Sequence, residues 1–315
     1  MLWALIGLWV LVKLIQGAWW CLRSFWAWLG RGKSVHGVVE RNLVSEEVRQ
    51  TIEAIDALRA AQHVGKGQQG PVIRLSHEMV REVRRAQRYV RDDFLDHLRL
   101  GWYQVTIIFF IGSVAGLVLE EVWMLASMGV AQYRSGLVWG PLSPLYGVGA
   151  VLLTITTFAM RSYDSRGWQV FLVSLVLGGF LEQITGWGME TFMDAVSWDY
   201  VAGHVPGAIT KWVAVPFLLF WGALGYVWYR WVMPELLFVL GEPTTRRKYI
   251  FTVLLAVYLS LDIFMTVACF TRRAARDDGV PPANAFEEWV DKNYSNEFMS
   301  SRFQNMVIDA SGTQS

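Results

Sequence analysis

The chain has 315 residues, of which 54% are hydrophobic and only 17% are charged, and its formal net charge is +1. The near-neutral charge excludes binding to nucleic acid through bulk positive charge, and the long apolar runs exceed what a soluble domain of this size needs. The composition therefore predicts a polytopic membrane protein whose first partner is the lipid bilayer.

Six segments are long and apolar enough to cross a bilayer core, which takes about 20 residues of helix. They lie near residues 2–29, 103–128, 141–160, 167–193, 212–233 and 249–271. The first segment carries Lys13, Gln16 and Arg23 at helical spacing, so it either spans the membrane or lies along its interface. We predict an all-α bundle of about six transmembrane helices.

Residues 31–100 are polar and contain thirteen Lys and Arg against ten Asp and Glu, a net charge of +3. Helix start signals at Ser45 and Ser76 flank the glycine-rich break GKGQQGP. The pattern predicts a helical hairpin that leads into the next membrane helix. The hairpin is interpreted either as a solvated spacer or as a dedicated binding domain.

The chain is accordingly divided into four parts. Residues 1–30 form an N-terminal membrane helix, 31–100 a cytoplasmic helical hairpin, and 101–274 a five-helix membrane core. The polar tail, 275–315, contains one short amphipathic helix around Phe286, Trp289 and Val290.

The distribution of Lys and Arg predicts the orientation of the helices in a cell membrane, taken here as the inner membrane. Lys and Arg gather in 31–100, 161–166 and 234–248, whereas 194–210 contains neither. The positive-inside rule then places these basic segments in the cytoplasm and 129–140 and 194–210 outside. Arg272, Arg273 and Arg276 follow the last predicted span and disagree with this orientation, so the side of the tail stays open.

Three acids lie inside otherwise apolar segments. Glu120 occurs in IGSVAGLVLEEVW, and Glu182 and Glu190 occur in LGGFLEQITGWGME. A charged side chain at the bilayer centre costs roughly 2.5–3.5 kcal/mol on insertion scales, so such acids usually face a partner, a cavity or water. Glycines share their helix faces and predict close helix packing; these are Gly112, Gly116, Gly178 and Gly186.

The acids are expected in the outer half of the membrane, beside an irregular Pro- and Gly-bearing turn at 139–147. We predict one acidic, tryptophan-rich pocket that opens outward and contains a solute path. Lys211 is the nearest counter-charge, for either Asp199 or Glu190. The other pocket candidates are Tyr146, Trp198 and Tyr200.

A short internal similarity links the two acidic segments. Residues 116–122 (GLVLEEV) resemble residues 178–184 (GGFLEQI), and each segment is followed by a helix with Pro and Gly. Transporter folds often contain such repeats. The similarity is interpreted either as a duplicated pair of hairpins or as a chance match.

Several catalytic patterns are absent from the sequence. It contains no GxxxxGK[ST], HExxH or GxSxG pattern and no tight His/Cys cluster. No metal site or cofactor is predicted, and ATP hydrolysis through a P-loop is excluded. The sequence alone leaves open whether the chain is an enzyme.

The chain resembles the CmpB-type family of ABC transporter permeases over roughly residues 103–308. The matching stretches occur in order along the chain: Phe109–Glu120, Gly140–Gly149, Leu181–Glu190, Trp198–Tyr200, Leu219–Gly225 and Val290–Met306. One departure is Lys211-Trp212, where the family usually has Gly-Arg, and a lysine lacks the bidentate fork of an arginine.

The resemblance implies a membrane subunit that moves a small or amphipathic solute with a separate ATP-binding subunit. Glu120, Glu182 and Glu190 would line the path, and the 31–100 hairpin or the 234–248 loop would meet the partner. Two alternatives remain. One is an outward-facing membrane enzyme that acts on a lipid-linked or head-group substrate, and the other is a non-catalytic structural or regulatory subunit.

Overall fold

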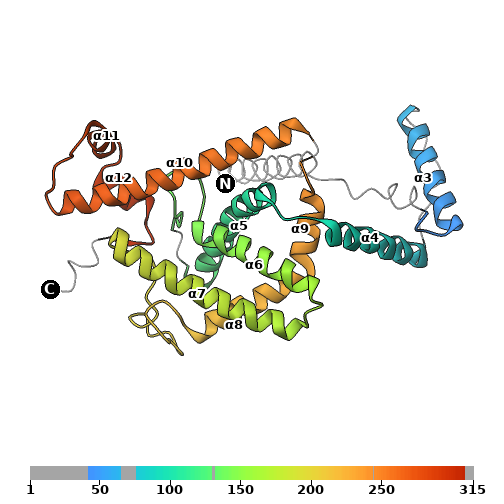
Figure 1. The fold of residues 1–315 in the computed structure, drawn as a ribbon, viewed down its shortest axis with the longest axis horizontal. Coiled ribbons are helices and arrows are strands. Elements are labelled where there is room, and N and C mark those ends of the chain that lie inside the picture. The colour runs from blue at the N-terminus through green and yellow to red at the C-terminus, as the bar shows by residue number, and fades with distance from the viewer. Residues whose placement is uncertain (1–41, 65–75, 130–131, 244, 309–315) are drawn as a thin grey trace, which may run out of the picture. The chain divides into compact units, whose positions relative to one another are not determined.

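The computed structural model describes residues 42–64, 76–129, 132–243 and 245–308 (Figure 1). The predicted N-terminal helix, 1–30, lies outside these residues. About three quarters of the described chain is helical and only two short strands occur in it, so the predicted all-α class is confirmed. It divides into two units: the residues up to Arg99 together with Pro234–Gly241, and Leu100–Met233 together with Glu242 onward. The membrane helices α5, α6, α7 and α10 belong to the second unit.

The described part of the first unit contains α3 (Glu46–Val64), α4 (His77–His97) and most of α9 (Met233–Leu240). Helix α4 begins after Ser76, whose side chain accepts a hydrogen bond from the backbone of Met79. Its apolar face packs on α3, where Val48, Ile52 and Val83 form a small core.

Helix α9 is joined to the C-terminal half of α4. The Arg91 guanidinium donates to the Glu235 carboxylate at 2.8 Å, and the rings of Phe94 and Phe238 meet edge to face. The polar hairpin and the segment that follows the fifth predicted span therefore belong to one packed unit. This contact requires both to lie on the same side of the membrane.

The second unit contains two helical hairpins, a long helix and the C-terminal tail. Helices α5 (Trp102–Met128) and α6 (Pro144–Ser162) form the first hairpin, and α7 (Gly167–Met193) and α8 (Val215–Val227) lie side by side in the second (Figure 1). Helix α10 (Arg246–Asp277) follows. Four helices among the described residues are long and apolar enough to cross a membrane: α5, α6, α7 and α10.

Three expected boundaries differ from the structure. The span predicted at 141–160 begins at Pro144, because Gly140 adopts a positive φ of 67° and the chain enters the helix only at a proline, which is favoured in the first turn. The last span is longer than 249–271 and runs from Arg246 to Asp277.

The span predicted at 212–233 is the third difference. Helix α8 starts at Val215 and has only 13 residues, and it continues through the π-helical turn η1 (Trp228–Val232) into α9. Pro234 explains the π turn, because proline has no N–H to donate to the carbonyl one turn earlier. The helical path from Val215 to Leu240 is therefore continuous but locally widened.

The tail folds back on the end of α10 as two short helices, α11 (Ala285–Asn293) and α12 (Asn296–Arg302), where one was expected (Figure 1). Strand β2 (Val307–Ile308) then pairs antiparallel with β1 (Ala195–Val196), directly after α7. Phe270, Val290, Met299 and Phe303 are buried in the core between the tail and α10. The tail thus lies on the same face as the loop residues 132–143 and 194–214, which we call the loop face.

Candidate functional site

The three acids predicted from the sequence are each engaged by a different partner. Glu120 accepts a 2.7 Å hydrogen bond from Arg134 in the first loop, and Glu190 accepts one of 2.7 Å from Lys211 in the second. Glu182 accepts a 2.9 Å hydrogen bond from the indole N–H of Trp221. Each of the three acids therefore accepts a hydrogen bond through one carboxylate oxygen from the loop or helix that follows it in the same hairpin.

Glu182 is the most deeply placed of the three. Its side chain is 7% exposed, and its Oε2 atom has no hydrogen-bond partner among the described residues. Trp221 is a neutral donor, so within the described chain no cation pairs with this carboxylate. A buried carboxyl group with a free oxygen and no counter-charge is costly to keep in a bundle.

The glycine faces pack against the second helix of each hairpin. A Cβ added to Gly116 would lie 2.2 Å from the Tyr146 ring, and one added to Gly178 would lie 2.0 Å from Trp221. Gly112 meets Ala150 in the same way, and Gly186 meets Trp212. These glycines therefore allow close packing of the following segment on the helix backbone, by an aromatic side chain at Gly116, Gly178 and Gly186.

The two hairpins use the same arrangement twice. Tyr146 of α6 covers Gly116, and its hydroxyl interacts electrostatically with the carboxylate of Glu120, four residues further along α5. Trp221 of α8 covers Gly178 and donates to Glu182, also four residues further along α7. In both, an aromatic side chain fills a glycine gap, and its polar atom interacts with the acid of the next turn. The arrangement favours a duplicated pair of hairpins over a chance match.

The loop tyrosine Tyr200 joins the two acidic positions. Burial raises the pKa of the Tyr200 hydroxyl above its usual range, and the nearby carboxylates of Glu182 and Glu120 raise it further. The Tyr200 ring stacks on Phe217 with the centroids 4.6 Å apart, and its backbone N–H donates to the carbonyl of Lys211. Two acids from different hairpins therefore share one electrostatic environment with this phenol.

Two further predicted residues shape the second loop. Asp199 accepts hydrogen bonds from the backbone N–H groups of Val201 and Ala202, so its carboxylate stabilises a turn of the loop. Of the two acids considered for Lys211, Glu190 is therefore the one that pairs with it. The Trp198 indole donates to the Trp212 carbonyl at 3.1 Å. Both residues position the loop that carries Tyr200 and Lys211.

A family model described as "Putative ABC-transporter type IV" matches residues 107–267, just over half of the chain. The chain belongs to this family. The match begins in α5 and ends in α10, so it contains both hairpins and all three acids. No curated protein and no solved structure matches the chain.

Outside the acids, this ABC-transporter-type chain has a second polar cluster that the sequence analysis missed. Asp262 of α10 is fully buried and accepts a 2.9 Å hydrogen bond from the backbone N–H of Trp139. Thr266, one turn later, accepts from the backbone N–H of Val138. The sequence did contain a signal for this cluster: Asp262 lies inside the apolar run LSLDIFMTV, and an acid in an apolar helix is the feature by which Glu120 was identified.

Arg302 of α12 completes this cluster from the tail. Its guanidinium donates to the carbonyls of Leu137 and Gly140 and stacks over the Tyr133 ring, 4.5 Å from the centroid. No local sequence pattern predicts this contact, because 162 residues separate Arg302 from Gly140. The loop that carries Arg134 is therefore held by α10 on one side and by the tail on the other.

The three arginines that conflicted with the orientation rule are engaged by the tail. Arg272 donates to Asp291 at 2.6 Å and to Glu287 at 3.1 Å, and Arg276 also pairs with Asp291. Arg273 pairs with Asp277. These arginines have structural partners in the folded tail, so their number alone is a poor guide to the side of the membrane.

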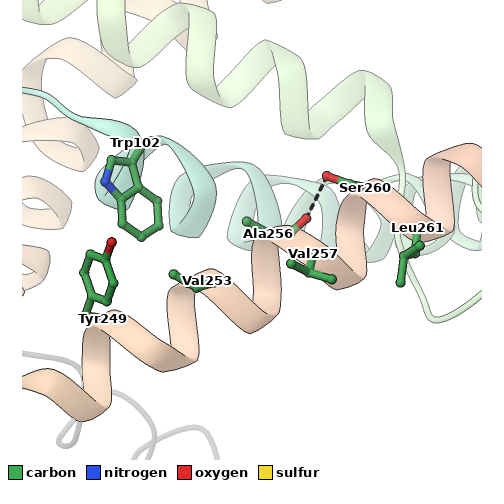
Figure 2. A pocket seen from close by; sticks show the side chains of 7 residues that line it. All are labelled: Trp102, Tyr249, Val253, Ala256, Val257, Ser260 and Leu261. Carbon is green, nitrogen blue, oxygen red and sulfur yellow. Dashed lines mark hydrogen bonds between the residues drawn. The ribbon is translucent and has the colours of Figure 1, made fainter.

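An apolar groove of about 430 Å³ lies away from the acids, along α10 and the start of α5 (Figure 2). Trp102 and Tyr249 meet edge to face at one end, and Ser260 donates its hydroxyl to the Ala256 carbonyl of its own helix. The remaining lining is aliphatic: Val253, Val257 and Leu261. The Trp102 indole and the Tyr249 hydroxyl are the polar groups at that end, and the otherwise apolar lining fits the hydrocarbon of a bilayer.

No group of three or more His, Cys, Asp or Glu residues is close enough to hold a metal ion within the part of the chain that the structure describes. Cys269 is a free thiol buried beside the tail. The site's polar chemistry thus consists of carboxylates, their two cations and aromatic donors.

Proposed function

We propose that this chain is the membrane-spanning permease subunit of an ABC-type transporter, which moves a solute with the energy supplied by a separate ATP-binding subunit. The family match across the membrane helices carries the proposal. The lack of a P-loop in the sequence supports the need for a separate ATPase. The inner membrane is the proposed location.

We propose that the solute passes the acids of the two hairpins. The free, buried oxygen of Glu182 supports this assignment, because a solute with a hydrogen-bond donor or a positive charge would satisfy it. Glu120 and Glu190 would line the same path on either side, with Tyr146, Tyr200 and Lys211 as neighbours. The loop face would be the external entrance, as the distribution of Lys and Arg predicts.

The proposed contact with the ATPase is the first unit. The sequence offered two candidates for this contact, the polar hairpin and the segment 234–248, and the ion pair between Arg91 and Glu235 joins part of each in one unit. A partner that binds this unit would move α9, and the helical path through η1 connects α9 to α8 and Trp221.

The enzyme alternative requires two carboxylates that are free to hold a head group. Glu120 and Glu190 instead pair with Arg134 and Lys211 of their own hairpins, which disfavours general acid–base catalysis at these positions. The same pairing favours the alternative of a non-catalytic subunit in which the acids only lock helices together. An experiment must therefore separate transport from stability.

The test is purification of the native protein in a gentle detergent, identification of co-purifying proteins by mass spectrometry and an assay of ATP turnover. We expect a stoichiometric ATP-binding subunit whose turnover falls in Glu182→Gln while the melting temperature stays near wild type. Glu121→Gln is the matched control, because Glu121 adjoins Glu120 on α5 but has no partner within the described residues. The absence of any ATPase, with unchanged uptake in all variants, would refute the permease assignment.

A further inference from the structure

Helix α4 carries a stripe of four arginines on the face opposite its packed side. Their spacing of three, one and three residues places all four on one face of the α-helix. The four are Arg81, Arg84, Arg85 and Arg88. All four are exposed. We call this set the arginine stripe.

The opposite face of α4 is already occupied. Val83 and Met79 pack on α3, and Phe94 meets Phe238 of α9. Among the described residues of the first unit, the basic face of α4 is thus the one that no other helix covers.

The stripe has no acidic partner among the described residues. The one hydrogen bond of its side chains there is from the Arg81 Nε to the His77 carbonyl of the same helix. The nearby acid Glu82 is engaged by Ser45 of the α3 start, and Asp92 pairs with Arg91 outside the stripe. Four positive charges therefore stand together without internal compensation.

The covalent connection keeps this stripe near the membrane. Helix α4 ends at His97 and the membrane helix α5 begins at Trp102, so four residues separate them. Four extended residues reach at most about 14 Å. Arg88 lies nine residues before the end of α4, about 14 Å along the helix axis. A basic helical face so close to a span is the chemistry that recognises anionic head groups.

We propose that the arginine stripe binds the phosphate groups of anionic phospholipids, which holds α4 along the membrane surface. The inference does not depend on the proposed transport activity. Charge attracts head groups only within about one Debye length, about 8 Å at physiological salt. The stripe therefore acts only when α4 lies flat on the surface, and anionic lipid fixes the placement of the unit that contains α9.

The experiment uses the full-length chain in nanodiscs of phosphatidylcholine alone and of phosphatidylcholine with an equal share of phosphatidylglycerol. Backbone hydrogen exchange is measured over residues 77–97. Each arginine near an anionic surface contributes on the order of fivefold to binding. We expect exchange to be slowed at least about tenfold by phosphatidylglycerol, and less at high salt.

Variants separate charge from fold. The quadruple change R81Q/R84Q/R85Q/R88Q is expected to abolish the lipid effect, whereas R81K/R84K/R85K/R88K retains it because the attraction depends on charge. Arg49→Gln, an exposed arginine of α3 outside the stripe, is the matched control and leaves the effect intact. Equal exchange of α4 in phosphatidylcholine for all variants shows that the hairpin still folds.

Two results with lipid alone would overturn the proposal, and a third concerns a protein partner. One is equal exchange of wild-type α4 in both lipids, and the other is a lipid effect that survives the four glutamines. If α4 is protected only when an acidic protein co-purifies, the stripe is a protein-binding surface and the lipid assignment is wrong.

Discussion

The ion pair between Arg134 and Glu120 is the connection between the first loop and α5, and its removal is a direct test of the site geometry. The two side chains are 12% and 22% exposed, and their N···O distance is 2.7 Å. Removing one partner of a fully buried pair costs about 3–5 kcal/mol, because the other charge is left uncompensated. Since Glu120 is partly exposed, we expect about 2–3 kcal/mol for Arg134→Gln, at or below the lower end of that range.

A double-mutant cycle isolates the interaction. Arg134→Gln, Glu120→Gln and the double variant are unfolded by denaturant titration in micelles, and we expect a coupling energy of about 1–3 kcal/mol. Arg49 and Glu46 of α3 form the control pair, because both side chains are exposed and solvent screening should leave their coupling weak. A coupling for Arg134 and Glu120 no larger than that of the control would refute the view that this pair fixes the loop.

Two further predictions concern packing and pH. Gly178→Ala would place a Cβ 2.0 Å from Trp221 and should destabilise the protein by at least about 1–3 kcal/mol. The Cβ of Gly188→Ala would meet no atom within 4 Å, so this variant should stabilise the helix by roughly 0.5–1 kcal/mol. Melting curves of the two variants that shift in the same direction would contradict this account. Arg272 and Arg276 lower the pKa of Asp291 from its ordinary 3.8, so its stabilisation of the tail is complete above that value and is lost as the pH falls through the lowered pKa. Proteolysis of the tail, measured as a function of pH, should therefore show a weaker acid dependence in Asp291→Asn than in the wild type. An acid profile that is the same in both would contradict this prediction.

The spans and helix starts were largely predictable because they depend on neighbouring residues. Apolar runs of the right length marked α5, α7 and α10, and Ser76 marked the start of α4. The start of α6 was missed by three residues, since the left-handed backbone at Gly140 depends on contacts with α10 and Arg302. The division of the tail into α11 and α12 was missed because each is short and is stabilised mainly by packing on α10.

The candidate site shows the same division. Hydropathy alone indicated that Glu120 and Glu182 are exceptional, because an acid in an apolar helix is costly in any fold. Their partners were not readable: Arg134 lies in a loop without a distinctive pattern, and Trp221 is one of 17 tryptophans. Their roles as substrate-path residues remain a prediction.

The sequence by itself determined that this protein is a bundle of membrane helices with acids in two of them, because hydropathy and helix length act locally along the chain. Tertiary structure alone decided which residue meets each acid and where the tail lies. Arg272 meets Asp291 only after the chain reverses between α10 and α11, and Arg302 reaches Gly140 across more than half of the chain. Such contacts depend on how helices pack in three dimensions, so they cannot be predicted from composition or from the spacing of residues.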